Sequence, residues 1–321
     1  MNSGCPIGTD LSRASELLRN GGVVAFGTET VYGLGASVEH PKAIARVFEV
    51  KNRPTFDPLI VHISEAEQVG DIAQSFPPMA KILADAFWPG PLTLVLPKRD
   101  YVPDLVTAGR PTVAIRIPGA EPARELLRAA GVPVAAPSAN PFGRISPTTA
   151  RHVADQLGEQ IDYIYDCGPC AVGIESTVLD ITSGTPWLLR PGGVNLEDIE
   201  EVIGPVQRFH GAEKGAQRAP GMLTKHYAPR TMLRITAEPT ANARRIGVLS
   251  FGSVQDANKF TSVEVLSPTR DLTEAAANFF AALRRLDEAG LDEIQATPFP
   301  AVGVGRALND RLRRAAATHE S

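Results

Sequence analysis

The chain alternates short apolar runs with segments of helical periodicity. Residues 23–26 and 59–63 are apolar runs bounded by glycine, proline or polar residues, which predicts two buried strands. Between them, a polar turn at residues 28–30 precedes a predicted helix that begins at Pro41 and runs to Lys51. The stretch therefore predicts a strand, a turn, a helix and a second strand in direct succession.

The same alternation continues to about residue 207. Helices are expected at residues 10–20, 64–73, 77–87 and 121–130, and Ser146 is expected to cap a further helix. Apolar runs predict strands at residues 92–96, 113–117, 132–136, 161–165, 176–181 and 187–189. Strands that alternate with helices indicate an α/β domain over residues 1–207.

A change of composition then marks a domain boundary. Residues 208–231 are rich in glycine, proline, lysine and histidine and lack periodicity, which is typical of a linker. After the linker, strands are expected at residues 233–236, 246–250, 263–266 and 293–296, and helices at 271–289 and 306–317. This alternation predicts a small parallel α/β domain over residues 232–321.

Composition and charge narrow the class of protein. The 321 residues are 43% hydrophobic and 21% charged, which suits two globular domains. A net charge of −4 argues against non-specific binding to nucleic acid or anionic membranes. No apolar run approaches the roughly 18 residues of a membrane span, and the first residues lack a basic flank before an apolar core. We therefore expect a cytoplasmic protein.

Three cysteines are too few for a four-thiolate zinc site. Residues 167–170 spell Cys-Gly-Pro-Cys, which is a redox motif when its first cysteine begins a helix, because the helix dipole lowers the thiol pKa. Here predicted strands lie on both sides of the motif. We therefore expect a connection between strands and not a redox site.

Several predicted elements end in groups suited to anions. Lys51 and Arg53 follow a helix, and Arg190 ends a strand before two glycines. A solvated basic loop is the alternative for the first pair. Arg116 lies among apolar residues in a strand, so it needs either an anionic ligand or a structural carboxylate.

Two further segments carry neutral polar groups. Ser138 and Asn140 lie between two prolines, and in an extended segment both would offer their side chains to one ligand. The helix expected after Ser146 would present free N–H groups to an anion, although capping alone would explain the serine. Ser176 begins a predicted strand.

Together these motifs resemble the YrdC/Sua5 family. The linker sequence and the appended α/β domain narrow the resemblance to the two-domain Sua5 branch. Five motifs in the family's order carry it over nearly the whole chain: residues 28–35 (TETVYGLG), Lys51 with Arg53, Ser138 with Asn140, residues 175–177 (EST), and one linker motif made of residues 220–222 (PGM) and 225–229 (KHYAP).

The resemblance implies a threonylcarbamoyl-AMP synthase, a nucleotidyltransferase. Such an enzyme condenses L-threonine, bicarbonate and ATP into threonylcarbamoyl-AMP and pyrophosphate. A downstream tRNA threonylcarbamoyl transferase complex then uses the product to modify adenosine 37 of tRNAs that read ANN codons. Positioning and charge neutralisation should dominate this chemistry, because phosphoryl-type transfer leaves little covalent work for the protein.

The resemblance also implies an architecture. A YrdC-like twisted mixed-sheet domain would contain an open cavity, the linker would cover it as a lid, and a Rossmann-like parallel α/β domain would follow. Mg²⁺ would arrive with the ATP phosphates, without a metal ligand from protein side chains. We expect a monomer without stable nucleic-acid binding and without a membrane.

Individual site residues follow from the resemblance. The positions that match those holding L-threonine are Thr30, His62, Arg116, Ala136 and Ser176. The positions that match those around ATP are Lys51, Arg53, Asp57, Thr112, Ser138, Asn140, Ser146, Arg190, His226 and Tyr227. Lys51 and Arg53 are the expected catalytic residues, and as loop cations they should be replaceable without loss of the fold.

The chain departs from the family pattern at a few positions. Asp57 stands where asparagine is common, and facing a triphosphate it would need a proton or a cation nearby. Gly27 stands where a proline is usual, which would loosen the following turn, and Cys167 replaces a usual glycine. The linker departs at residues 219 and 223–224.

Two other functions fit the same motifs. The basic loops would also suit a non-catalytic RNA-binding module, which the acidic net charge disfavours. A related carbamoyl-adenylating enzyme would use carbamoyl phosphate in place of bicarbonate.

Overall fold

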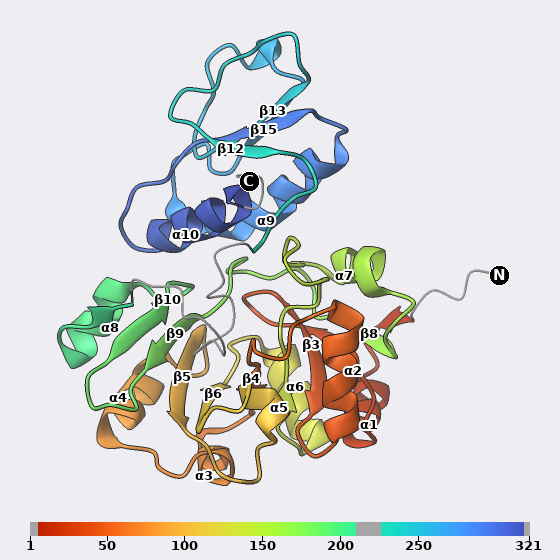
Figure 1. The fold of residues 1–321 in the computed structure, drawn as a ribbon, viewed down its shortest axis with the longest axis vertical. Coiled ribbons are helices and arrows are strands. Elements are labelled where there is room, and N and C mark those ends of the chain that lie inside the picture. The colour runs from red at the N-terminus through yellow and green to blue at the C-terminus, as the bar shows by residue number, and fades with distance from the viewer. Residues whose placement is uncertain (1–5, 210–225, 318–321) are drawn as a thin grey trace.

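The chain forms two α/β domains that stack on each other (Figure 1). The computed structural model describes residues 6–209 and 226–317. The larger domain is built on an 11-stranded sheet and the smaller on a 4-stranded sheet. The predicted succession of a mixed-sheet domain and a parallel α/β domain is confirmed.

The large sheet combines parallel and antiparallel strands. Its strands are β1 (Ile7–Gly8), β2 (Val24–Gly27), β3 (Tyr32–Ser37), β4 (Ile60–His62), β5 (Leu92–Pro97), β6 (Thr112–Arg116), β7 (Val134–Ala135), β8 (Tyr163–Tyr165), β9 (Thr177–Asp180), β10 (Trp187–Arg190) and β11 (Gln207–Arg208). They lie in the order β1-β8-β2-β3-β7-β4-β6-β5-β9-β10-β11. This order brings β4 beside β6 and β5 beside β9, so chain segments far apart in sequence share one sheet.

Helices cover both faces of the large sheet. They are α1 (Leu11–Arg19), α2 (Pro41–Lys51), α3 (Val69–Ile72), α4 (Pro78–Phe87), α5 (Asp104–Thr107), α6 (Glu121–Ala130), α7 (Ala150–Leu157) and α8 (Leu196–Ile203). Strand β2 explains the continuous apolar run at residues 23–26. Val24 and Phe26 pack with α1 and α6, whereas Ala25 packs with α2 on the other face.

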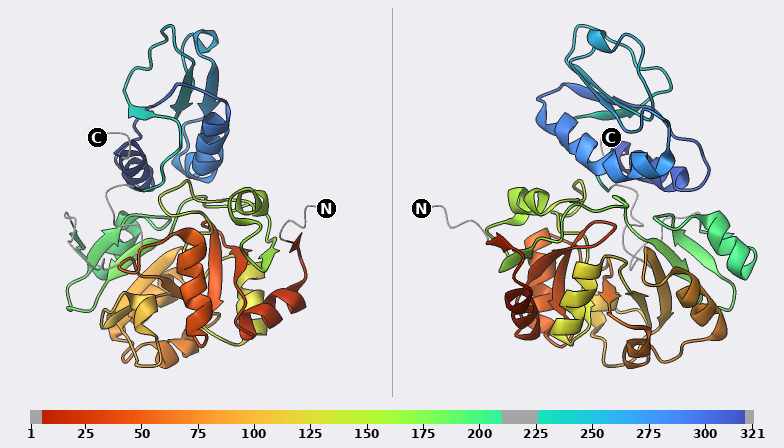
Figure 2. Two further views of the ribbon diagram at one scale, coloured as in Figure 1. Left: turned by 45° about the vertical axis from the view of Figure 1, so that its right-hand side comes forward. Right: turned by 180° about the vertical axis from the view of Figure 1, so that it is seen from behind.

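The small domain has a parallel sheet with both of its α-helices on the side of the large domain (Figures 1 and 2). Its elements are β12 (Leu233–Ile235), β13 (Ile246–Ser250), β14 (Ser262–Val265), α9 (Leu272–Glu288), β15 (Glu293–Ala296) and α10 (Gly305–Ala316). The strand order is β12-β15-β13-β14, and every pairing is parallel. Within the described ranges, no helix is both long and apolar enough to span a membrane.

The two domains share an apolar contact. Val31 and Ile174 of the large domain belong to the same buried cluster as Phe280 of α9. Gly173 allows this approach, because a Cβ atom there would lie 2.5 Å from the carbonyl oxygen of Ala276. The domains are therefore packed against each other and are not held by the linker alone.

Some local expectations are wrong. Residues 64–73 form a short 3-10 helix, Ala66–Gln68, and then α3, instead of one helix. The helix expected to be capped by Ser146 begins at Ala150, and the Thr149 hydroxyl caps it by accepting from the His152 N–H at 3.2 Å. Strand β3 and helix α8 were not expected, because glycines in β3 and the short length of α8 obscure their periodicity.

Two departures from the family pattern meet in space. A Cβ atom on Gly27 would lie 2.9 Å from the Cβ of Cys167 and 2.8 Å from the ring of Tyr32. Gly27 therefore makes room for the cysteine. Residues 167–170 connect β8 to β9, as predicted for the Cys-Gly-Pro-Cys segment, and burial raises the pKa of the Cys167 thiol to about 12. A raised thiol pKa is the opposite of what a redox cysteine needs.

We predict that Gly27→Ala lowers the free energy of unfolding by roughly 1–3 kcal/mol, because overpacking forces neighbouring groups apart. Adding Cys167→Gly removes one of the two obstructing groups, so the double variant should recover part of this loss. Urea unfolding measures both values. Gly70→Ala is the matched control, since no atom lies within 4 Å of a Cβ there. A double variant no more stable than Gly27→Ala would contradict the contact with Cys167.

Candidate active site

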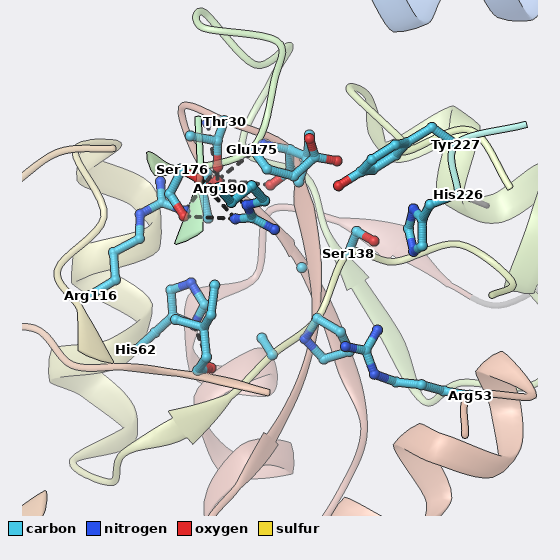
Figure 3. A pocket seen from close by; sticks show the side chains of 16 residues that line it. Thr30, Arg53, His62, Arg116, Ser138, Glu175, Ser176, Arg190, His226 and Tyr227 are labelled. Atoms are coloured by element: carbon cyan, nitrogen blue, oxygen red, sulfur yellow. Dashed lines mark hydrogen bonds between the residues drawn. The ribbon is translucent and has the colours of Figure 1, made fainter. Parts of the chain in front are cut away.

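One cavity of the large domain collects most of the predicted site residues (Figure 3). Its wall comes from the turn before β3, from β4 and β6, from the segments after β7 and before β9, from the end of β10, and from the end of the linker. The predicted residues in this wall are Thr30, Arg53, His62, Arg116, Ala136, Ser138, Ser176, Arg190, His226 and Tyr227.

Arg116 is buried and its charge is balanced by Glu29. Its Nη2 donates to Glu29 Oε1 at 2.6 Å, and its Nη1 donates to the Thr30 hydroxyl at 2.9 Å. Burial raises the pKa of Glu29, but the charge of Arg116 and the hydrogen bonds from Arg116 and backbone N–H groups together lower it below its ordinary value. Of the two partners considered for Arg116, the structural carboxylate is therefore present, and the pair fixes the Thr30 turn against β6.

His62 lies next to Arg116 on the neighbouring strand. Strands β4 and β6 are parallel and place His62 opposite Arg116 in register. Burial, together with the charge of Arg116, lowers the pKa of His62 to about 3. The ring is therefore neutral near pH 7, and its Nδ1 lies 3.2 Å from the Ile60 carbonyl oxygen. A neutral ring held by that carbonyl leaves Nε2 as a hydrogen-bond acceptor.

Ser176 and Arg190 form the centre of the cavity wall. Nη2 of Arg190 donates to the Ser176 hydroxyl at 3.1 Å and to the Ser176 carbonyl oxygen at 2.9 Å. The Ser176 hydroxyl also lies 2.8 Å from the Thr93 hydroxyl. Gly192 permits this arrangement, because a Cβ there would lie 2.3 Å from the carbonyl carbon of Ser176.

Lys51 supports the cavity from behind. It is the last residue of α2, is 1% exposed, and donates to the carbonyl oxygens of Ser138 and Asn140 at 2.5 Å each. Burial, and then the nearby charge of Arg53, lowers its pKa well below the ordinary value. Lys51 therefore ends a helix and is not part of a solvated basic loop, the alternative considered for this pair, and it holds the segment that carries Ser138.

Arg53 lies in the cavity wall and forms a buried ion pair. Its Nη2 is 3.0 Å from Asp57 Oδ2, and its Nε and Nη2 donate to the carbonyl oxygens of Asp57 and Pro58. The structure thus supplies the cation that Asp57 was expected to need. Because Arg53 is only 7% exposed, it too is not a solvated loop cation.

Five predicted residues lie outside the cavity wall: Lys51, Asp57, Thr112, Asn140 and Ser146. Thr112 begins β6, four residues before Arg116. The Asn140 amide nitrogen donates to the carbonyl oxygens of Pro141 and Arg144, so it holds its own loop, and Asn140 does not line the cavity with Ser138. The Ser146 hydroxyl donates to Glu175 Oε1 at 2.6 Å, which explains why it does not cap a helix.

The end of the linker fills much of the cavity. His226 and Tyr227 are 4% and 1% exposed, and Tyr227 has a left-handed backbone with φ of 64°. The remaining space is about 50 Å³. Small-molecule sites are typically about 300–1,000 Å³. The cavity that was expected to be open is therefore nearly closed in this structure. Linker residues 219–225, where other departures were noted, lie outside the described residues.

Comparison with known proteins gives matches over both domains. Residues 16–192 match a family model described as telomere recombination, and residues 194–317 match the threonylcarbamoyl-AMP synthase C-terminal domain. A threonylcarbamoyl-AMP synthase of Pyrococcus abyssi is 43% identical, and the match covers 94% of this chain and 92% of that protein. One of Bacillus subtilis is also 43% identical, over 95% of this chain and 92% of that protein.

The chain belongs to the two-domain Sua5 family. Family members named threonylcarbamoyl-AMP synthase are enzymes that use ATP and transfer an adenylyl group. This chain is an enzyme of that family.

Solved structures agree with this assignment. The crystal structure of P. abyssi Sua5 complexed with L-threonine superposes with a TM-score of 0.90 at 41% identity, covering 96% of this chain and 94% of that one. E. coli YciO superposes with a TM-score of 0.51 at 23% identity, over 59% of this chain and 92% of that one. The second likeness shows the fold of the large domain alone.

Sequence reasoning missed two carboxylates of this Sua5 site. Glu29 adjoins Thr30 in the motif of residues 28–35, and its partner Arg116 was expected to need an anionic ligand or a structural carboxylate, so part of the signal was present. Glu175 lines the cavity, and its Oε2 accepts from Nε of Arg311 at 2.9 Å. Arg311 lies on α10 of the small domain, and no local pattern in the sequence connects it to this site.

The depressed pKa of His62 predicts loss of stability in acid. Between about pH 6.5 and 3 the unfolded chain binds a proton at this residue and the folded chain does not, so the free energy of unfolding falls as pH falls. At pH 5 the contribution is about 2 kcal/mol. His62→Gln should therefore lose less stability between pH 7 and pH 5 than the unaltered protein, as urea unfolding at the two pH values will measure. His40→Gln, a change at a half-buried histidine outside the cavity, is the control and should leave the pH dependence in place. Equal slopes for His62→Gln and the unaltered protein would contradict the prediction.

Proposed function

We propose that the chain is an L-threonylcarbamoyladenylate synthase that condenses L-threonine, bicarbonate and ATP into threonylcarbamoyl-AMP and pyrophosphate. The observation that carries the proposal is the distribution of groups in one cavity. Figure 3 shows Arg116 and His62 toward one side, Arg53 and the linker residues toward the other, and Arg190 between them. This arrangement suits an amino acid at one end and a nucleotide at the other.

The amino-acid end combines charge with neutral polar groups. Arg116 has five N–H donors. The described residues use three of them, through Gly90, Glu29 and Thr30, which leaves two for a carboxylate. The side-chain hydroxyl of L-threonine would find the neutral His62 ring and Ser176 nearby. The L-threonine bound to P. abyssi Sua5 supports this substrate for the present chain.

The nucleotide end combines Arg53 and Arg190 with the Ser138 hydroxyl. In the proposed reaction, the threonine amine attacks bicarbonate, giving a carbamate and water. A carbamate oxygen then forms a bond to the α-phosphorus, and the bond from that phosphorus to the bridging oxygen breaks, so pyrophosphate leaves with both electrons. Arg53 and Arg190 would neutralise the phosphates, and the closed cavity would shield the carbamate from water.

Mg²⁺ is the proposed cofactor. Across the described residues, no group of three or more histidine, cysteine, aspartate or glutamate side chains is placed to hold a metal ion. The arginine-rich cavity wall suits a metal that arrives already bound to the ATP phosphates, which keeps several of its own water ligands. When bound, Mg²⁺ would neutralise phosphate charge and favour the departure of pyrophosphate.

The linker is proposed to act as a lid. His226 and Tyr227 occupy the nucleotide end, and the 50 Å³ that remain would not admit ATP. These side chains must therefore move when ATP binds, and they could close over it afterwards. Delivery of the product to a tRNA threonylcarbamoyl transferase complex, modification of adenosine 37, a cytoplasmic location and a monomeric state stay predictions.

Omission of each substrate in turn tests the function. We expect pyrophosphate release only when L-threonine, bicarbonate and ATP are all present, with the adenylate product detected by mass spectrometry. Carbamoyl phosphate should not replace bicarbonate. Pyrophosphate release that is indifferent to threonine would contradict the proposal. Salt-dependent tRNA binding without any adenylate would favour the RNA-binding alternative.

The Arg53–Asp57 pair gives a second prediction. Asp57→Asn installs the residue that is common in the family and removes the carboxylate that balances Arg53 at 3.0 Å. More of the Arg53 charge then acts on the phosphates, so the KM for ATP should fall by a factor on the order of 2–10, while the KM for threonine stays unchanged. Steady-state kinetics measure both. A higher KM for ATP would instead assign Asp57 a direct role in holding the nucleotide or its metal.

A further inference from the structure

Arg311 connects the small domain to the candidate active site. It lies on α10 and is fully buried. Arginine is rarely buried without a partner, so its contacts are informative. Its Nε donates to Glu175 Oε2 at 2.9 Å, and its Nη1 donates to the Pro191 carbonyl oxygen at 2.8 Å. Its guanidinium carbon lies 5.2 Å from the centre of the Tyr227 ring. One side chain therefore contacts two segments of the large domain and one segment of the linker.

These contacts reach the cavity wall directly. Glu175 and Tyr227 line the cavity, and Pro191 follows Arg190, which also lines it. The segments that carry Glu175 and Pro191 are packed closely, since a Cβ on Gly192 would lie 2.4 Å from the Glu175 carbonyl oxygen. Movement of Arg311 would consequently disturb the wall on both sides of Arg190.

Glu175 places a negative charge in the cavity wall, and Arg311 balances this charge. A carboxylate in the wall of a site for a triphosphate repels the ligand unless a cation balances it. Arg311 forms an ion pair with this carboxylate, with side chains 0% and 7% exposed. Ser146 donates to the other carboxylate oxygen.

Other charged or titratable groups also face this pair. Nη1 of Arg311 donates to Asp310 Oδ2 at 2.8 Å, and Arg314 pairs with the same carboxylate, so α10 carries two cations for Asp310. Arg190 on β10 and Tyr227 of the linker lie near the pair as well.

We infer that Arg311 is a positioning residue of the ATP site, which neutralises Glu175 and fixes the wall around Arg190, so that the small domain completes the site of the large one. The inference takes ATP as the ligand and in this respect rests on the proposed function. It assigns the small domain a part in nucleotide binding, beyond stacking against the large domain.

Simple docking of the domains is the alternative role for Arg311. The same helix offers a matched control, because Arg306 of α10 forms an ion pair with Glu197 of α8 across the same two domains. That pair is partly exposed, and neither residue lines the cavity. Arg306→Met therefore removes a contact between the domains without changing the charge near the nucleotide.

The experiment compares Arg311→Met, Arg311→Lys, Arg306→Met and the double variant Glu175→Gln with Arg311→Met. Loss of one partner leaves the other as an uncompensated buried charge, so Arg311→Met should raise the KM for ATP on the order of tenfold or more. The KM for threonine should change much less. Arg306→Met should leave both constants unchanged, and Arg311→Lys, which keeps the charge, should be intermediate.

The double variant separates charge compensation from docking. It should recover most of the affinity for ATP that Arg311→Met loses, since no unpaired carboxylate remains. A double variant as weak as Arg311→Met, or an Arg311→Met variant with unaltered kinetics, would overturn the inference. If Arg311→Met does not fold, as judged by circular dichroism, Arg311→Lys and the double variant still decide it.

Measurements on the unaltered protein separate failure of the proposed function from failure of the inference about Arg311. If it makes no adenylate but binds ATP in calorimetry, the proposed function fails, and the same variants are compared by their ATP affinity. If it binds no ATP at all, both the function and the inference are overturned.

Discussion

Pairing of buried charges is the constraint on which this structure depends. Arg53, Arg116 and Arg311 are almost fully removed from solvent, and each has a carboxylate within 3.0 Å: Asp57, Glu29 and Glu175 respectively. An unpaired charge at such depth would cost several kcal/mol. The pairs of Arg116 and Arg311 join segments far apart in sequence, and the pair of Arg53 closes a single loop. The pairs that keep the cations charged therefore also fix the shape of the cavity.

This constraint explains how cationic groups gather around one cavity in an acidic protein. The charges of Arg53 and Arg116 are partly balanced by their carboxylate partners, and both side chains line the cavity. Lys51 contributes in another way, because it binds two carbonyl oxygens and sets the position of Ser138. The same balance makes the two domains one functional unit. Glu175 comes from the large domain, its cation comes from the small domain, and Tyr227 of the linker stacks beside them.

Much of the fold could be predicted from local pattern. The apolar runs at β2, β4, β5 and β6, and the strands and helices of the small domain, were predicted close to their observed positions, because a period of two or 3.6 is visible in a single segment. Errors occurred where a side chain had a distant partner. Ser146 looked like a helix cap, but its hydroxyl binds Glu175, and Thr149 caps the helix instead.

The sequence by itself determined the fold class, the two-domain order, the family, and the residue types that could hold an anion. It also indicated that Arg116 needs either an anionic ligand or a structural carboxylate, because a buried arginine cannot remain unpaired. Only the tertiary structure decided which carboxylate serves each cation, that Lys51 and Asn140 hold loops, and that Tyr227 fills the cavity. The physical reason is that charge pairing and close packing act between residues brought together by folding, as Glu175 and Arg311 are from opposite domains, and no local period records such a pair.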